Sequence, residues 1–360
     1  MNDFLQAVNR FLARLGSVKT SELIILLKQL AALVESGVPI VPSLAILAEQ
    51  AKNKRLKLTL NDIKTTVEGG QSLSEAMDKH PKIFPLTVRS TVRIGEVSGM
   101  LDTSIVQVTE FLEEQGTLKA AVITALIYPA IVLTATLGVV GFMVLGVIPK
   151  IIPFIEMMGG EMPWNTKLLV TITNYTQTHI KSIAIGLASF VGAIFILYRT
   201  RWGKYYLDYA KMLLPLFGIV IRYNIIVQFS KTMFLLMSSG VTIVESLRTV
   251  RETNKNAVVR RAIDRFIGKV LLGENLSESM IKAKELFPPM VGNMVKVGEE
   301  TGTMDAAMRR IADIHYSILQ NYIKRLNAAL EPIMLLMLGG MVGFVAAGMI
   351  GGILAGYVAK

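Results

Sequence analysis

The segment SGVPIVPSL (residues 36–44) recurs as SGVTIVESL (residues 239–247), at an offset of 203 residues. The same offset, held without a gap, aligns GQSLSEAM (residues 70–77) with GENLSESM (residues 273–280). Of the 75 positions from 28 to 102, 27 are identical to their counterparts 203 residues later. Unrelated segments would share only a few residues, so the chain contains an internal duplication, and this duplication decides the fold.

The composition is that of an integral membrane protein. Hydrophobic residues make up 52% of the 360 residues and charged residues only 18%, whereas a soluble domain carries about a quarter charged residues. The mean hydropathy is +0.50. The absence of cysteine excludes disulfide scaffolds, thiol catalysis and thiolate metal sites. The three histidines, at positions 80, 179 and 315, are far apart and outside any HExxH spacing, so we expect no zinc enzyme and no cofactor.

Two long charge-free runs are membrane-span candidates. Residues 120–149 and 332–359 carry no charge, and about 20 apolar residues are enough for a helix to cross a bilayer. A third candidate, residues 182–198, is shorter and has a polar upstream extension. Because two homologous, charge-rich halves should face the same compartment, the chain must cross the membrane an even number of times between them. The third candidate is therefore expected to be a real span, and the two termini are expected on opposite sides.

The distribution of positive charge predicts the orientation. Residues 1–119 hold 14 Lys and Arg, and residues 199–328 hold 20, whereas the linker between the first two spans has only Lys150 and Lys167, balanced by Glu156 and Glu161. Since positive charge accumulates on the cytoplasmic side, both halves are predicted to be cytoplasmic in a bacterial inner membrane. The C-terminus is then periplasmic.

Neither half shows a strand pattern. Capping signals (Ser72 with Glu75, and Asn275 with Glu278) and proline breaks (at Pro85 and Pro288) divide each half into about six short helices. The predicted fold class is an all-α integral membrane protein with two homologous cytoplasmic six-helix bundle domains and three transmembrane helices. The start of the chain does not resemble a cleavable signal and predicts a short amphipathic helix, either packed on the membrane or its own domain or docking a partner. The predicted parts are this N-terminal segment (1–19), cytoplasmic domain 1 (20–119), transmembrane helix 1 (120–149), a short periplasmic linker (150–167), transmembrane helix 2 (168–198), cytoplasmic domain 2 (199–328) and transmembrane helix 3 with the C-terminus (329–360).

The most conspicuous polar motif is GExxGxxD, which occurs once in each copy. The GExxG stretch is expected to form an inter-helix turn, at which Gly99 and Gly302 give backbone freedom. Asp102 and Asp305 are expected to lie in the first turn of the next helix, where the helix dipole favours negative charge. Catalysis by paired carboxylates and cation binding are alternative interpretations. A helix start does not need a glutamate at the end of the preceding helix, so Glu96 and Glu299, with the two aspartates, are candidate partner contacts.

Two further patterns concern helix packing in the membrane. Small residues four apart in the last span predict close helix association, within or between chains, at Gly339, Gly343, Gly348, Gly352 and Gly356. Pro129 and Pro332 are equivalent in the repeat, each just inside a membrane run. Proline disrupts a helix interior, so Tyr128–Pro129 and Pro332 are predicted kinks.

The second half carries 20 basic against 11 acidic residues, and its Arg260, Arg261 and Arg265 could form a basic face. Without a reading motif or interleaved aromatic residues, nucleic acid is not expected. An acidic protein partner or anionic lipid fits better. The chain lacks a GxxxxGK[ST] loop, which excludes nucleotide hydrolysis by the P-loop route. It also lacks charges within the first and last spans, which disfavours a transporter.

These residues resemble the inner-membrane platform family of type IV pilus and type II secretion machines, often called the PilC or F-protein family. The resemblance rests on the two SGV…SL copies, both GExxGxxD motifs and the run ALIYP (residues 125–129), followed by Val132, Thr136, Met143 and VIP (residues 147–149). It covers nearly everything from about residue 20 onward. One departure is Ala121, where the family commonly has a basic residue or Gln.

The resemblance implies a non-enzymatic scaffold that couples a cytoplasmic assembly ATPase to the extraction of pilins from the membrane. Its implied partners are the hexameric ATPase, pilins or pseudopilins, inner-membrane alignment proteins, membrane lipid and further copies of the chain. Under this interpretation the basic cluster faces the ATPase. Pilus assembly and protein secretion use the same fold, so a secretion platform is an equivalent alternative. A membrane transporter or a membrane-bound enzyme is the alternative of another class.

Overall fold

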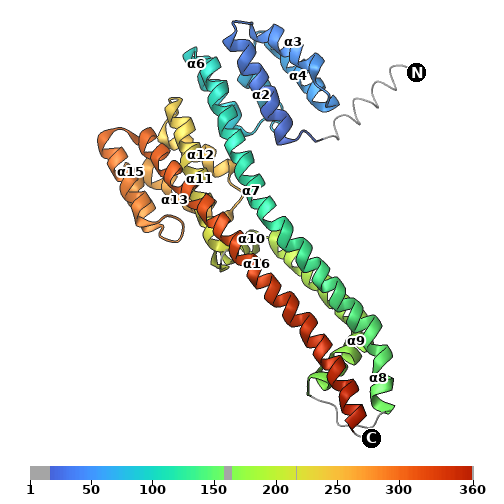
Figure 1. Ribbon diagram of the computed structural model, residues 1–360. Coiled ribbons are helices and arrows are strands. Elements are labelled where there is room, and N and C mark those ends of the chain that lie inside the picture. The colour runs from blue at the N-terminus through green and yellow to red at the C-terminus, as the bar shows by residue number, and fades with distance from the viewer. Residues whose placement is uncertain (1–16, 158–163, 216, 359–360) are drawn as a thin grey trace, which may run out of the picture. The chain divides into compact units, whose positions relative to one another are not determined.

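The computed structural model describes residues 17–157, 164–215 and 217–358, and all regular structure in these ranges is helical (Figure 1). The expected all-α class is therefore confirmed for the described residues, while most of the predicted N-terminal segment lies outside them. The elements are α2 (Thr20–Glu35), α3 (Ile40–Gln50), α4 (Lys54–Glu68), α5 (Leu73–Asp78), α6 (Leu86–Ser98), α7 (Leu101–Phe142), the π-helical turn η1 (Met143–Val147), α8 (Ile148–Met157), α9 (Trp164–Arg199), α10 (Arg201–Leu213), α11 (Phe217–Ser238), α12 (Ile243–Thr253), α13 (Ala257–Leu271), α14 (Leu276–Lys282), α15 (Pro289–Thr301) and α16 (Met304–Val358).

The duplication found in the sequence is reproduced in the backbone. Helices α3, α4 and α6 begin and end at the same repeat positions as α12, α13 and α15, and α7 and α16 begin at equivalent residues. The caps match as well: the side chain of Asn53 accepts hydrogen bonds from two backbone N–H groups at the start of α4, and Asn256 does the same for α13. The helix boundaries thus follow from local signals that both copies have kept.

The left-handed glycines also come in equivalent pairs. Gly37, Gly70 and Gly99 have positive φ angles, as do their counterparts Gly240, Gly273 and Gly302. Gly99 (φ 73°) and Gly302 (φ 70°) end α6 and α15 in the left-handed conformation. Glycine adopts this conformation without strain, whereas residues with a side chain rarely do. The turn of the GExxGxxD motif is therefore confined to this glycine and the residue after it. The expectation that the whole GExxG stretch forms the turn is wrong, because Gly95 and Glu96 lie inside α6.

The described helices divide into two compact units. One combines both repeat copies (Met1–Ala120 and Asp208–Gln320), and the other contains the apolar helical segments (Ala121–Leu207 and Asn321–Lys360). Helices α7 and α16 each begin in the first unit and end in the second.

Each repeat copy has its own apolar core. In the first copy, Leu27, Leu30, Ile63 and Phe84 are fully buried, contributed by α2, α4 and the loop before α6. In the second copy three aromatic rings meet: Phe287 lies 5.1 Å from Phe229 and 6.0 Å from Phe266, centroid to centroid. Burying a large side chain of this kind stabilises a fold by about 1.5 to 3 kcal/mol.

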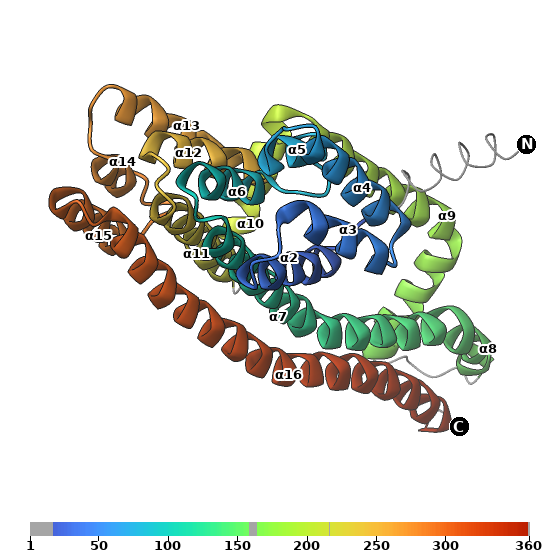
Figure 2. The same ribbon diagram turned by 90° about the horizontal axis from the view of Figure 1, so that it is seen from above.

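The second unit is held together by the helices that carry the charge-free runs. Val144, Ile148, Leu169 and Val345 form a small apolar cluster that joins η1, α8, α9 and the second half of α16. Figure 2 shows the ribbons of α8, α9 and α16. The hydroxyl of Thr166 on α9 donates a hydrogen bond of 2.6 Å to the carbonyl oxygen of Gly348 on α16. Elsewhere these helices expose their apolar side chains, and none of the most apolar window of α9 is buried.

Four described helices are long and apolar enough to cross a membrane, by length and composition. Three of them overlap the predicted spans: Ala130–Pro153 overlaps 120–149, Thr166–Arg199 contains 168–198, and Met304–Gly351 overlaps 329–360. The fourth, α11, is the least apolar, and more than half of its apolar window is buried. Its buried residues include the charged Lys231.

The helices bend at positions that the proline pattern did not indicate. Helix α9 contains one residue with non-helical backbone angles, His179 (φ −111°, ψ 16°), and α7 passes into the π-helical turn η1 after Phe142. Helix α7 continues through Tyr128 and Pro129, and α16 continues through Pro332. The kinks predicted at these three residues stay predictions.

Candidate functional site

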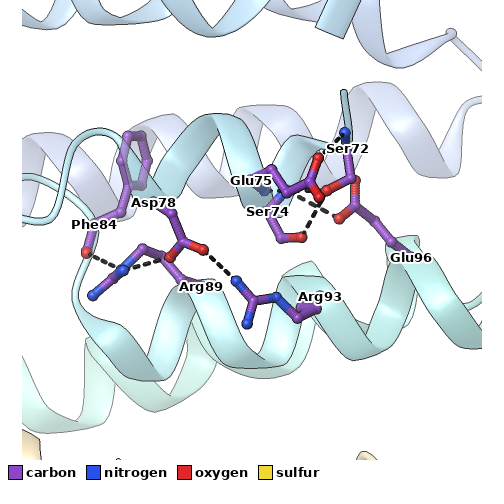
Figure 3. A network of polar contacts seen from close by, with 8 residues as sticks. All are labelled: Ser72, Ser74, Glu75, Asp78, Phe84, Arg89, Arg93 and Glu96. Carbon is purple, nitrogen blue, oxygen red and sulfur yellow. Dashed lines mark hydrogen bonds and ion pairs between the residues drawn. The ribbon is translucent and has the colours of Figure 1, made fainter. Parts of the chain in front are cut away.

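The carboxylate of Glu96 binds the N-terminus of a neighbouring helix. From inside α6 it accepts hydrogen bonds from the backbone N–H groups of Leu73 and Ser74, the latter at 3.0 Å, at the start of α5 (Figure 3). At the same helix end, Ser72 and Glu75 form the reciprocal capping box that the sequence predicted. Two side chains local to α5 and one from α6 therefore satisfy backbone donors that a helix start leaves without intrahelical partners.

The second copy repeats this arrangement. Glu299 on α15 accepts hydrogen bonds from the N–H groups of Leu276 (2.6 Å) and Ser277 (3.0 Å) at the start of α14. The local cap is weaker here, because Asn275 makes no side-chain cap hydrogen bond. Glu299 is thus the main side-chain acceptor described at this helix start.

The glycine before each glutamate packs against the long helix that follows: Gly95 of α6 against α7, and Gly298 of α15 against α16. A Cβ placed on Gly95 would lie 2.6 Å from the Cβ of Ser104, at the start of α7. A Cβ on Gly298 would lie 2.7 Å from the Cβ of Ala307 on α16. Because real Cβ atoms do not approach so closely, only glycine allows α6 and α15 to pack this tightly onto α7 and α16. The Gly–Glu pair therefore has the same role in both copies: the glycine allows close packing on the long helix, and the glutamate binds the N-terminus of the short one.

We expect the Glu299→Gln variant to unfold with about 1 to 2 kcal/mol less stability than the parent, because a neutral amide replaces a charged acceptor at two backbone donors. The matched control is Glu300→Gln, since Glu300 is exposed and makes only a 3.8 Å ion pair with Lys296. Chemical denaturation of the detergent-solubilised protein, followed by circular dichroism, measures both changes. Equal midpoints for the two variants would remove the capping role of Glu299.

Figure 3 also shows an ion-pair network that belongs to the first copy alone. Asp78 pairs with both Arg89 and Arg93, and Arg89 also donates a hydrogen bond of 3.1 Å to the carbonyl oxygen of Phe84. At the positions of Asp78 and Arg89 the second copy has Ile281 and Gly292, which are in close contact. The two copies therefore brace the same helix pair by different means, one ionic and one apolar.

The two aspartates of the motif lie in the first turn of the long helices α7 and α16, as predicted. Asp102 is exposed and accepts a long hydrogen bond of 3.4 Å from the hydroxyl of Thr103. Asp305 is half-buried. No group of three His, Cys, Asp or Glu side chains placed to hold a metal ion occurs in the described part of the chain. Contact of the motif's carboxylates with a partner stays a prediction.

The predicted basic cluster lies on α13. Arg261 and Arg265 are exposed and one helical turn apart, and Arg260 is half-buried. Arg265 lies 3.6 Å from Glu285. The repeat positions of the cluster in the first copy are Lys57, Leu58 and Asp62, so two of its three positive charges are peculiar to the second copy.

One polar contact that sequence reasoning missed joins the two copies. Lys231 on α11 makes an ion pair with Glu114 on α7, and its ammonium group lies 4.5 Å from the ring centre of Tyr316 on α16. Next to it, the side-chain amide of Gln115 donates a hydrogen bond of 2.5 Å to Gln228. The only available signal was a lysine in a helix whose residues are mostly apolar.

A groove of about 570 Å³ opens beside this contact. Both copies line it: Thr20, Pro85 and Thr87 come from the first, and Asn224, Gln228, Asn254, Lys255 and Asn256 are among those from the second. Its amide and hydroxyl groups can donate and accept hydrogen bonds, so the groove offers polar contacts beside apolar ones from Leu112 and Val250.

The glycines of the last span differ in their surroundings. Gly339 and Gly343 have open space where a Cβ would point, so no described part of the chain packs closely against them. Gly348 is buried against α9. Gly352 and Gly356 belong to α16, but their surroundings lie outside the described residues. Close association at these glycines stays a prediction.

Taken together, the geometry defines a class: a duplicated helical module carried on apolar helices, in which both copies share the Glu contacts that position their short helices. The family model described as "Type II secretion system (T2SS), protein F" matches the chain twice, at residues 26–149 and 229–352. The chain belongs to this family. It is a membrane protein of the type II secretion and type IV pilus group.

Relatives of both kinds cover almost the whole chain. "Type IV pilus assembly protein PilC" of Thermus thermophilus is 34% identical over 349 residues, which is 96% of this chain and 85% of the relative. The protein of the same name from Myxococcus xanthus is 32% identical over 334 residues, 93% of this chain and 80% of the relative. "Type II secretion system protein F" of Vibrio cholerae is 27% identical over 334 residues, 91% of this chain and 80% of the relative.

Proposed function

We propose that this protein is a non-enzymatic inner-membrane platform that couples a cytoplasmic assembly ATPase to the extraction of pilins and their addition to a type IV pilus. The observation that carries the proposal is the match of both repeat copies to the protein F family. The relatives at 34% and 32% identity are named for pilus assembly. The absence of a P-loop from the sequence fits a protein that receives work from a separate ATPase.

The proposed topology has three spans, at residues 120–149, 168–198 and 329–360, with both repeat copies in the cytoplasm and the C-terminus in the periplasm. The helix that complicates this count is α11. We place α11 outside the membrane because most of its apolar residues, and Lys231 with them, are buried among those of the two copies. A charged side chain at the centre of a bilayer is unfavourable. The positive charge of both copies supports the cytoplasmic placement.

The duplication suits the proposed mechanical role. Two copies of one module in a single unit offer related but non-identical surfaces, one braced by the Asp78 network and the other carrying the α13 arginines. We propose that Arg260, Arg261 and Arg265 meet acidic side chains of the ATPase. Glu96 and Glu299 act indirectly, by holding the helices that shape each module. Pilins, inner-membrane alignment proteins and further copies of the chain complete the proposed set of partners.

Deleting the gene in its host tests the proposal. Electron microscopy of the cell surface and an immunoblot of the membrane for processed pilin give the two readouts. We expect filaments to be absent while mature pilin persists in the membrane. Normal filaments together with normal export would contradict a platform function of either kind.

A secretion platform is the second candidate, because relatives named type II secretion system protein F match over almost the same length. In the same deletion strain, unchanged filaments with exported proteins trapped inside the envelope would favour this candidate. A transporter is disfavoured, because duplicated transporters usually repeat their spans, whereas this duplication lies mainly in the charged halves.

We expect charge reversal at the exposed arginines, Arg261→Glu with Arg265→Glu, to weaken co-purification of the ATPase at least tenfold, because both ends of the contact would then be acidic. The control is Lys57→Glu, the exposed residue that occupies the position of Arg260 in the first copy. The two variants should unfold at similar denaturant concentrations. Equal ATPase recovery from both would exclude α13 as the contact.

A further inference from the structure

Helix α10 presents an aromatic face that the described residues leave uncovered. Trp202, Tyr206, Tyr209 and Leu213 follow one another at spacings of four, three and four residues, which places them on one side of the helix. Trp202 is 73% exposed and Tyr206 is 63% exposed, and the other two side chains are exposed as well. Soluble proteins rarely expose a continuous apolar stripe, so this face is expected to meet something other than water.

Another side of α10 is firmly held, so the stripe is not the result of a loose helix. Asp208 is buried and accepts a hydrogen bond of 3.0 Å from the backbone N–H of Ala257, at the start of α13. Lys211 donates a further hydrogen bond of 3.1 Å to the same carboxylate. Met212 is also buried. The helix is therefore fixed by one side and presents its aromatic residues on another.

The position of α10 in the chain indicates what the stripe meets. Helix α9, which exposes its apolar side chains along its length, ends at Arg199, and α10 begins two residues later. Arg199 lies 5.5 Å from the ring of Phe195, and Lys204 lies 5.7 Å from the ring of Tyr198. Cations and amphipathic rings at the end of an apolar helix are typical of the layer where lipid headgroups meet acyl chains.

Composition also favours lipid over a protein partner. Tryptophan and tyrosine have an apolar body and a polar tip, which suits a boundary with one dry and one wet side. A helix with an aromatic apolar face and flanking lysines is typical of helices that lie in the plane of the membrane surface. The lysine charges complement the phosphate groups of the headgroups.

We propose that α10 lies in the headgroup layer of the membrane, with Trp202, Tyr206 and Tyr209 directed into the lipid. This inference rests on the proposed membrane crossing of α9. It goes beyond that crossing by assigning a lipid-binding surface to a helix that the sequence analysis had included in a cytoplasmic domain. Through Asp208, the same helix holds the start of α13.

The chain is convenient for a depth measurement because it has only two tryptophans. Trp164→Phe leaves Trp202 as the sole tryptophan in the full-length protein, which is then reconstituted into vesicles of phosphatidylethanolamine and phosphatidylglycerol and excited where tyrosine does not absorb. Quenching is compared for lipids with a nitroxide near the headgroup, for lipids with a nitroxide near the acyl-chain end, and for aqueous iodide. We expect at least twofold stronger quenching by the shallow nitroxide than by the deep one, with little quenching by iodide.

Two results at Trp202 alone would overturn the inference. Strong iodide quenching without lipid quenching would place Trp202 in water. No quenching by either nitroxide lipid or by iodide would place it under protein.

A second sole-tryptophan variant, Trp164→Phe, Trp202→Phe and Phe190→Trp, reports on α9, where Phe190 is exposed in the middle of the apolar stretch. Deep quenching at position 190 without shallow quenching at position 202 would reject the surface helix and keep the crossing. Absence of deep quenching at position 190 would reject the membrane crossing of α9 itself.

Discussion

Replacing Phe287 by alanine is expected to lower the stability of the protein by about 3 to 5 kcal/mol, one of the two largest effects that we predict. Phe287 is fully buried and packs edge-on against Phe229 and at a tilt against Phe266. The substitution removes an aromatic ring from a close-packed site and leaves a cavity that the neighbouring rings are too rigid to fill. Denaturant unfolding of the detergent-solubilised protein measures the change.

The repeat supplies the control for this prediction. Phe84 is equally buried at the equivalent position, but its neighbours at the positions of Phe229 and Phe266 are Leu26 and Ile63. Because aromatic pairs contribute about 0.5 to 1.5 kcal/mol beyond the area that they bury, we expect Phe84→Ala to be less destabilising by about that amount. A loss below about 1 kcal/mol at Phe287 would contradict the described core.

Local signals in the sequence predicted several helix ends correctly. The capping box of Ser72 and Glu75, the left-handed glycine after α6 and the proline breaks are decided by residues a few positions apart, and each is found where expected. Interactions of this range depend little on the rest of the fold. The internal duplication supports these predictions further, because most of the signals occur at equivalent positions in both copies.

The role of Glu96 was less accessible, although the motif that contains it was recognised. The glutamate binds backbone groups that lie 22 and 23 residues earlier. Many helices contain a glutamate, and every helix start has backbone N–H groups without an intrahelical partner. Only the packing of α5 on α6 brings the carboxylate of Glu96 to these N–H groups. A carboxylate without a visible local partner was therefore interpreted as a contact for another protein.

Contacts between the two copies were beyond sequence reasoning altogether. Lys231 and Glu114 are 117 residues apart, and their repeat counterparts, Lys28 and Ser317, give no hint that the pair exists. The pairing depends on how two homologous modules pack into one unit, which neither hydrophobic periodicity nor capping chemistry specifies.

This contact between the copies carries the second large effect. Reversing its buried charge, Lys231→Glu, is expected to destabilise the protein by about 3 kcal/mol. The side chain of residue 231 is only 11% exposed, and a carboxylate there would face Glu114 in place of the ammonium group that now pairs with it. The partial exposure of Glu114 allows water to screen part of this repulsion, which keeps the expected loss at the lower end for a broken buried pair.

Further variants separate the ion pair from the effect of the substitution itself. Lys28→Glu changes the equivalent lysine of the first copy, where the pair with Glu113 is exposed on both sides, and it should cost less than about 1 kcal/mol. The double reversal, Lys231→Glu with Glu114→Lys, restores opposite charges and should recover about half or more of the loss. The single variant Glu114→Lys completes the cycle. If the losses of Lys231→Glu and Glu114→Lys simply add in the double variant, residues 114 and 231 are not coupled. In that case the two copies do not depend on this ion pair to stay together.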